Sequence, residues 1–342
     1  MPDLTTIFHH LQRQLFPALT DELGTLSTLD QQFCEVISLT DLGHFTRGYE
    51  GCGNGAPPCP RVWLAHAFIA KSVYQFPTTG ALIDALKSRP LLRQLCGWDS
   101  PGEIPSESTF SRAFATFARD QLPQQLHEHM VKTHAGPKLV GHASRDATAI
   151  EAPERPAPKP APPKRLELQP TRTLAENLAD LPARCDVGCK RNSKGHQESW
   201  IGYKLHLDTV DGDFPVSAVL TSASVHNSQV AIPLAQLSAQ RVTSLYDLMD
   251  SAYDAPQIHA FSRSLGHVPI IDPHPRGGDK LPLAPAEAAR FKERSAAERV
   301  NSLLKERYGG RWVRVRGAAK VMCHLMFGLL ALTATALFVR LC

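Results

Sequence analysis

The segment from Arg294 to Lys305 constrains the fold more than any other part of the chain. Read as a helix that turns about 100° per residue, it puts Arg294, Glu298 and Lys305 on one narrow face. The opposite face carries apolar side chains that need a core: Ala297, Val300, Leu303, Leu304 and Tyr308. A carboxylate on a rigid helix can hold a divalent metal, and flanking cations can hold phosphate oxygens. An ordinary surface Arg/Glu pair would give the same local pattern.

The composition admits a globular protein with a local nucleic-acid surface. A chain of 342 residues with 43% hydrophobic and 20% charged residues fits one or two ordinary domains. A net charge of +4 permits a nucleic-acid partner but requires any basic surface to be local. The start at Met1 does not resemble a secretory signal, so we expect a cytoplasmic protein with reduced cysteines. Cys185 and Cys189 lack the two-residue gap of a zinc knuckle.

Residues 1–138 are predicted to form an all-helical N-terminal domain. The helices expected there cover residues 61–74, 81–86, 90–96 and 107–118, with Thr78 or Thr79, Gly97 and Ser106 at their ends. In the 107–118 helix, apolar residues recur at core spacing: Phe110, Ala113, Phe114 and Phe117. Its other face is polar and carries Arg112. This order resembles a helix-turn-helix with Arg112 as a DNA contact, and an ordinary helical bundle is the alternative.

Residues 139–342 are predicted to form a mixed α/β domain. Strands are expected at 139–150, 200–208, 214–220, 244–250 and 268–271, with a tight turn at Asp211-Gly212. Helices are expected at 231–239, 253–266, 285–308 and from 317 to the end. The proline-rich start of the stretch 153–198 predicts an exposed insertion or linker. Such an order of elements favours a mixed sheet flanked by helices.

The last twenty residues are apolar enough to span a membrane. His324 and two threonines interrupt them, and these groups would be costly in lipid. We therefore expect a core helix with Leu325, Leu329 and Leu332 facing the sheet, and no membrane partner. We also expect Trp63, Trp200 and Trp312 to be packed inside the protein rather than stacked on DNA.

Three acids are placed where they can converge on a metal. Asp146 and Asp250 lie at or near predicted strand ends, and Glu298 lies on the late helix. Carboxylate oxygens with few other ligands suit Mg²⁺ or Mn²⁺ rather than zinc. Two such ions about 3.5–4 Å apart would activate a water or a 3′-hydroxyl and stabilise the leaving oxygen.

Each acid also has a purely structural interpretation. Asp146 would pair with Arg145 or Lys204, and Asp250 would cap the helix that follows it. Glu298 would be only the partner of the arginine one turn earlier.

Four segments resemble the Asp-Asp-Glu transposases of bacterial insertion sequences. Residues 144–148 resemble the strand of the first acid, and residues 200–206 resemble the hairpin after it. Residues 250–254 match the Asp-(2)-Tyr-Asp context of the second acid. Residues 291–305 match the Tyr-(2)-Arg-(3)-Glu-(6)-Lys helix of one large branch, and this last spacing is the specific one. The N-terminal half resembles the helical domain that precedes the core in these enzymes.

The resemblance implies an RNase H-like catalytic core and a definite activity. A homodimer would bind double-stranded DNA at the terminal inverted repeats, cut the ends with water and join a 3′-hydroxyl to target DNA in the bacterial cytoplasm. It makes Asp146, Asp250 and Glu298 the metal-binding catalytic acids, and Arg294 and Lys305 the phosphate contacts. A nuclease without strand transfer, a defective DNA-binding relative and a helical DNA-binding regulator are the rival interpretations.

The chain departs from the family pattern at three places. Phe291 stands where the pattern has tyrosine, which removes one hydroxyl contact to DNA. Ser251-Ala252 replaces the more usual Lys-Gly, and His226-Asn227 stands where relatives often have His-Asp. These changes bear on the efficiency of the site rather than on its identity.

Overall fold

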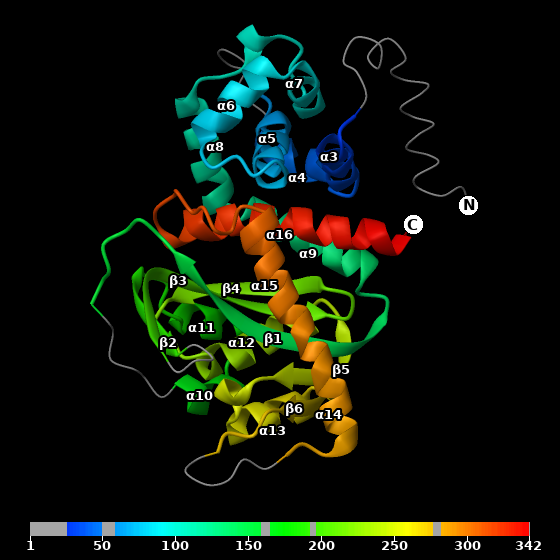
Figure 1. Ribbon diagram of the computed structural model, residues 1–342, viewed down its shortest axis with the longest axis vertical. Coiled ribbons are helices and arrows are strands. Elements are labelled where there is room, and N and C mark those ends of the chain that lie inside the picture. Colours follow the sequence, from blue (N-terminus) through cyan, green and yellow to red (C-terminus); the bar gives the residue numbers. More distant parts are fainter. Residues whose placement is uncertain (1–25, 50–58, 159–164, 192–195, 276–281, 342) are drawn as a thin grey trace.

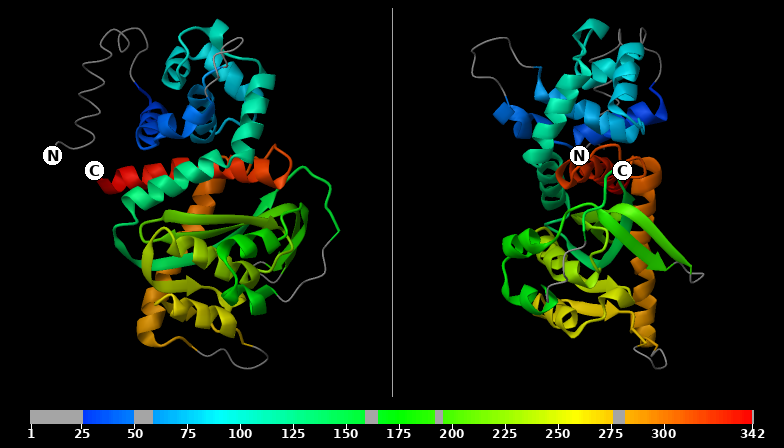
Figure 2. Two further views of the ribbon diagram at one scale, coloured as in Figure 1. Left: turned by 180° about the vertical axis from the view of Figure 1, so that it is seen from behind. Right: turned by 90° about the vertical axis from the view of Figure 1, so that its left-hand side faces the viewer.

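The computed structural model describes residues 26–49, 59–158, 165–191, 196–275 and 282–341. Three layers are visible in Figure 1: a cluster of helices, a layer with the long C-terminal helix, and a sheet with its own helices. The views agree that the C-terminal helix lies between the helical cluster and the sheet (Figure 2).

The N-terminal region is helical throughout its described part, as predicted. Its elements are α3 (Thr28–Ser38), α4 (Leu42–Thr46), η1 (Arg47–Tyr49), α5 (Arg61–Val73), α6 (Thr79–Ser88), α7 (Pro90–Cys96), η2 (Pro101–Glu103), α8 (Glu107–Arg119) and α9 (Leu122–His134). Thr78 caps α6 by accepting the Ala81 N–H, and Gly97 ends α7 in the left-handed conformation at φ 115°. Ser106 occupies the N-cap position of α8, but its side chain makes no capping hydrogen bond.

Six strands form one mixed sheet: β1 (Leu139–Glu151), β2 (Asp186–Arg191), β3 (Gln197–Val210), β4 (Phe214–Ser222), β5 (Thr243–Met249) and β6 (Val268–Ile271). The order is β2-β3-β1-β5-β6, with β4 also paired to β3. The chain turns back from β3 to β4 through Gly212 at φ 75°, which is the predicted hairpin. The central strand β1 pairs antiparallel with β3 and parallel with β5.

Helices cover both faces of this sheet (Figure 2). On one side lie α10 (Arg165–Leu168), η3 (Gln169–Thr171), α11 (Leu174–Asp180), α12 (Ser228–Ala239) and, after η4 (Ser251–Tyr253), α13 (Pro256–Ser264). On the other side α15 (Ser295–Arg307) crosses β1 and β3. The single helix predicted over 285–308 is wrong in one respect, because α14 (Pro285–Phe291) and α15 are separated by the 3₁₀ turn η5 (Lys292–Arg294).

The exposed linker predicted over 153–198 is largely wrong for its described part. Residues 165–191 form α10, η3, α11 and β2, and bury polar side chains that anchor them to α12. Gln169 donates to the Gln229 carbonyl at 2.6 Å, and Asn177 donates to the Gln236 side chain at 2.9 Å. Composition misled the prediction because the stretch combines these polar contacts with a few leucines, Leu166, Leu178 and Leu181, that are too widely spaced to form an apolar pattern.

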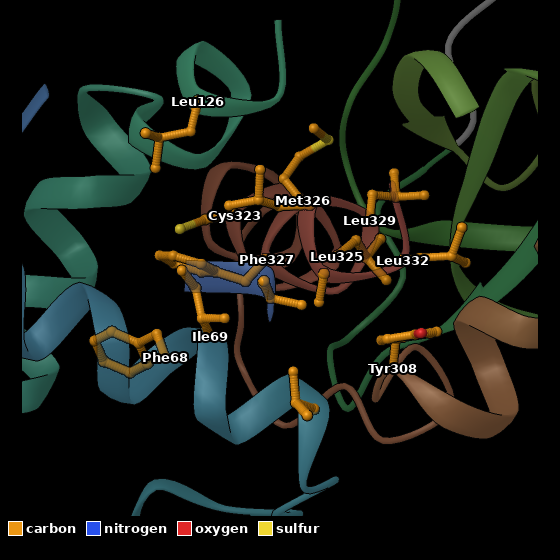
Figure 3. Packing of buried hydrophobic residues seen from close by; sticks show 14 of the residues in the cluster. Phe68, Ile69, Leu126, Tyr308, Cys323, Leu325, Met326, Phe327, Leu329 and Leu332 are labelled. Carbon is orange, nitrogen blue, oxygen red and sulfur yellow. The ribbon is translucent and has the colours of Figure 1, made fainter. Parts of the chain in front are cut away.

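The C-terminal helix α16 (Ala318–Leu341) is a core helix, as predicted. It is the one described helix long and apolar enough to cross a membrane, but most of its length is buried inside the protein. Leu325, Leu329 and Leu332 are all buried, and α16 packs on β4 of the sheet as well as on α3, α5, α8 and α9. In Figure 3, Leu325, Leu329 and Leu332 lie on the side of α16 that faces Tyr308, whereas Cys323 and Phe327 lie on the side of Phe68 and Ile69.

The helical cluster and the sheet therefore share one hydrophobic core. Phe327 of α16 lies 5.7 Å from the ring of Phe68 on α5 and 6.4 Å from the rings of Phe114 and Phe117 on α8. Among the tryptophans, Trp200 is buried as expected, whereas the expectation for Trp312 is wrong because half of its side chain is exposed.

Replacing Phe327 by alanine is expected to lower the free energy of unfolding by about 3–5 kcal/mol, because the cavity would lie where both layers meet. Urea unfolding measures the change. Val339→Ala is the matched control on the same helix, since Val339 is 74% exposed and its truncation should change stability by less than about 0.5 kcal/mol. Equal stability of the two variants would contradict the shared core.

Three buried histidines make the stability depend on pH. Burial lowers the pKa of His127 to about 3 and of His324 to about 4, and holds the pKa of His206 well below its usual value. Below about pH 6.5 the unfolded chain binds protons that these folded imidazoles exclude, so the free energy of unfolding falls as the pH falls. Each histidine is expected to cost about 1.4 kcal/mol of stability between pH 7.5 and pH 5.5.

The measurement is urea unfolding of His127→Gln at those two pH values. Its loss of stability on acidification should be about 1.4 kcal/mol smaller than that of the wild type. His129→Gln, on the exposed side of the same helix, should keep the wild-type pH dependence. An unchanged pH dependence in His127→Gln would show that burial does not lower the pKa of this imidazole.

Candidate active site

Two of the predicted acids stand opposite each other on neighbouring strands. In the parallel pair of β1 and β5, Arg145 is opposite Met249, so Asp146 and Asp250 follow at the next step of the register. Asp146 belongs to the central strand, while Asp250 lies just beyond the end of β5 as the N-cap of η4. This arrangement agrees with the prediction that the two acids sit at the same place on the sheet.

Helix α15 brings further polar side chains to the face of the sheet that carries Asp146. Asn301 donates from Nδ2 to the Asp146 carboxylate at 3.0 Å. Glu298 precedes Asn301 by three residues and Lys305 follows it by four, so all three share one side of the helix. The adjoining side buries Ala297, Val300 and Leu304 in the core, which fixes the rotation of the helix.

Arg294 and Glu298 form an ion pair across one turn. The Arg294 guanidinium lies 2.5 Å from the Glu298 carboxylate, although Arg294 itself belongs to η5 and immediately precedes α15. The Glu298 side chain is 55% exposed, whereas that of Arg294 is 20% exposed. Arg294 also interacts electrostatically with Asp146 and Asp250, so this one cation faces all three acids.

The two aspartates share an environment that disfavours their negative charges. Burial, supported by repulsion from Asp250 and Glu298, raises the pKa of Asp146 to about 6. Burial also raises the pKa of Asp250, against the opposing effects of the Ala252 N–H and the Arg294 charge. A bound cation would relieve both the burial and the mutual repulsion of these carboxylates.

The structural alternatives for Asp146 are not realised. Arg145 is buried on the other side of the strand and makes a bidentate ion pair with Asp208, with N–O distances of 2.7 and 2.8 Å. Lys204 donates to the Val225 carbonyl at 2.7 Å and to the Asn227 side chain at 3.3 Å. Asp146 is thus left facing α15.

The structural interpretation of Asp250, as a cap of the helix that follows it, is correct in part. Its Oδ1 accepts the Ala252 N–H at 2.9 Å and so caps the short turn η4. The described residues offer its carboxylate no ion pair at bonding distance, and His226 interacts with it electrostatically from an exposed loop.

Two buried polar groups beside the acids were missed by the sequence analysis. Asn301 was not singled out, although its spacing from Glu298 and Lys305 could have placed it on the same face of α15. Its Oδ1 is buried and has no hydrogen-bond partner. Tyr253 is fully buried with an equally unpartnered hydroxyl, and nearby Asp146 and Asp250 help burial to raise its pKa well above the usual value.

The two remaining residues that the sequence analysis predicted to contact DNA lie in different places. Lys305 is on α15, where it interacts electrostatically with Asp146 and Glu151, and burial lowers its pKa. Arg112 is exposed on α8 in the helical layer, beyond α16 from the sheet (Figure 1). The structure therefore brings Lys305 to the acids and keeps Arg112 apart from them.

The chemistry of these donors fits a hard divalent cation. Asp146 and Asp250 offer carboxylate oxygens from adjacent strands, and Asn301 adds an unpartnered amide oxygen next to them. Within the described residues, no three His, Cys, Asp or Glu side chains are gathered closely enough to hold a metal ion, and the Glu298 carboxylate is paired with Arg294.

Comparison with known families gives two matches that together span most of the chain. The transposase DDE domain matches residues 144–334, and a second transposase domain matches residues 22–116. No curated protein sequence matches the chain. The first match starts two residues before Asp146 and includes Asp250, Glu298 and most of α16. With its mixed sheet, its flanking helices and this match over more than half of its length, the chain belongs to the insertion-sequence transposases with a DDE catalytic domain of RNase H-like fold.

Proposed function

We propose that this protein is an active DNA transposase that binds the terminal inverted repeats of its own insertion sequence, cuts the ends and joins them to target DNA. One observation carries the proposal: Asp146 and Asp250 face each other on adjacent strands while α15 brings Glu298 to the same face. We infer that it works as a homodimer on double-stranded DNA, in the bacterial cytoplasm at the nucleoid.

The proposed roles follow the contacts of each side chain. Asp146, Asp250 and Glu298 would hold two Mg²⁺ or Mn²⁺ ions, with Glu298 leaving Arg294 to do so. When bound, such ions supply the activation of the attacking oxygen and the stabilisation of the leaving oxygen.

Arg294, released from Glu298, would then bind a backbone phosphate together with Lys305. Asn301 would orient the Asp146 carboxylate through its 3.0 Å hydrogen bond. Arg112 would contact the terminal repeat from the polar face of α8.

Conservative replacement of each acid tests the catalytic part of the proposal. Asp146→Asn, Asp250→Asn and Glu298→Gln should each lower the rate of end cleavage by at least about a hundredfold, because each removes a charge that the transition state needs. Cleavage is measured on a labelled inverted-repeat duplex with Mg²⁺ or Mn²⁺, and a gel shift measures DNA binding in parallel.

Binding should survive in all three variants, since the cations that hold phosphates remain. Cleavage by Glu298→Gln at the wild-type rate, or cleavage that persists in EDTA, would refute the mechanism. Cleavage without joining to target DNA would identify a nuclease instead of a transposase.

Asn301 is expected to act as a positioning residue for Asp146. Asn301→Ala should raise the Mg²⁺ concentration needed for half-maximal cleavage by roughly 10-fold to 100-fold, as is typical when the partner of a metal ligand is removed. Ser302→Ala, at the exposed neighbouring position of α15, should leave the metal dependence unchanged. A purely structural role for Asn301 would lower stability without shifting the metal titration.

A further inference from the structure

One hollow of the described protein lies at the end of the strand that carries Asp146. It has a volume of about 780 Å³ and runs between Glu151 at the end of β1, Trp200 on β3 and the segment from Arg311 to Arg314. That segment connects α15 to α16. The hollow thus opens beside the strand and the helix that carry Asp146 and Glu298.

A second hollow of about 520 Å³ lies on the helical side of the same segment. Its walls come from α5, α6 and α8 and from the beginning of α16, and they include Lys71 and Ser111. Both hollows are lined by Pro153 and Arg314. They are therefore two parts of one groove, which we call the junction groove, leading from the catalytic face to the polar face of α8.

The junction groove is strongly cationic. Its walls carry Lys71, Arg311, Arg314, Arg316 and Lys320, against the carboxylates of Glu107 and Glu151. In the part of the chain that the structure describes, Arg311 has a long ion pair with Glu306 at 3.7 Å, while Arg314, Arg316 and Lys320 have none.

Lys71 is enclosed without a carboxylate partner among the described residues. Burial lowers the pKa of its ammonium group to about 8. Polyanion phosphates would neutralise all of these cations at once.

An exposed aromatic ring stands on the wall of this groove. Trp312 is 50% exposed, and the Arg314 guanidinium lies 5.9 Å from the centre of its ring. The other tryptophans are buried or half-buried. A ring beside unpaired cations is the combination that binds single-stranded nucleic acid, because unpaired bases stack on the ring while phosphates meet the cations.

The position of the groove relates it to the cut. Glu151 ends the strand that carries Asp146, and Lys305 interacts electrostatically with Arg311, Glu151 and Asp146. Asp146 precedes Glu151 by five residues, about 16 Å along the strand, so a DNA strand a few nucleotides long could join the groove to the acids. The bases of an intact duplex are stacked on each other, so only an unpaired base can use the Trp312 ring.

We propose that the junction groove binds a single-stranded DNA tail next to the cleavage site, with a base stacked on Trp312 and phosphates on Arg314, Arg316 and Lys320. This proposal rests on the proposed function, because it takes DNA as the ligand of the groove. Its recognition chemistry is independent of sequence and of the metal.

The experiment measures binding of the full chain in EDTA, so that no cleavage occurs. The probes are one inverted-repeat duplex with blunt ends and the same duplex with a short thymidine tail on either the 5′ or the 3′ strand. One of the two tails should tighten binding roughly tenfold, the effect of stacking about one base on an aromatic ring. Quenching of tryptophan fluorescence by that tail should accompany the tighter binding.

The variants assign the effect to the groove. Trp312→Ala and Arg314→Ala should lose most of the tail effect, whereas Trp312→Phe should keep the tighter binding and lose the quenching. Arg263→Ala, at an exposed position of α13, is the matched control and should behave as the wild type.

A tail effect of equal size in Trp312→Ala, or equal binding of tailed and blunt duplexes by the wild type, would overturn the groove assignment. Cleavage of the inverted repeats would still stand as a separate result. Conversely, a Trp312-dependent tail effect in a protein that never cuts inverted repeats would refute the transposase activity and keep the groove.

Discussion

Burial of α16 is the interaction on which the rest of the structure depends. The helix is apolar all round, so it is stable only where protein surrounds it. Helices α5, α8 and α9 cover one side and β4 covers the other, which ties the helical layer to the sheet through one core. The predicted boundary at residue 138 therefore separates two kinds of secondary structure but not two independent cores. A substitution in the buried face of α16 should therefore destabilise both the helical layer and the sheet.

The same burial sets the electrostatics of the acids. Helix α15 packs against α16, β1 and β3, and this packing excludes water from Asp146. Among the described residues, Arg294 interacts with all three acids, while Lys305 interacts with Asp146 and Lys204 with Asp250. A carboxylate cluster with too little positive charge is unfavourable by itself and favourable around divalent ions. The Arg294–Glu298 pair supplies one positive charge to this cluster.

The sequence predicted regular elements well and polar contacts badly. It located α7 and β6 at their observed bounds, because glycine, proline and short apolar runs mark such elements locally. It also predicted that Asp146, Asp250 and Glu298 lie near one another, from their places on strand ends and a helix together with the resemblance to the Asp-Asp-Glu transposases. It missed β2, which is an edge strand paired only to β3, and α11, whose short apolar contact through Leu178 is combined with side-chain amide bonds from Asn177.

The break between α14 and α15 was missed too, since no glycine or proline interrupts residues 286–305. Asn301 was overlooked for a related reason. A hydrogen bond between residues far apart in sequence leaves no periodic signal along the chain.

The segment between α15 and α16 links catalysis to the junction groove in a way that only the structure reveals. Gly309 and Gly317, at φ 79° and 86°, bracket it and let the chain reverse direction between the two helices. Gly310 lies so close to Leu304 that an added Cβ would approach the Leu304 carbonyl to 2.9 Å. The turn is thus held tightly against the catalytic helix. Because Trp312 and Arg314 follow at once, the same turn fixes where these two side chains lie relative to α15, the helix of Glu298, Asn301 and Lys305.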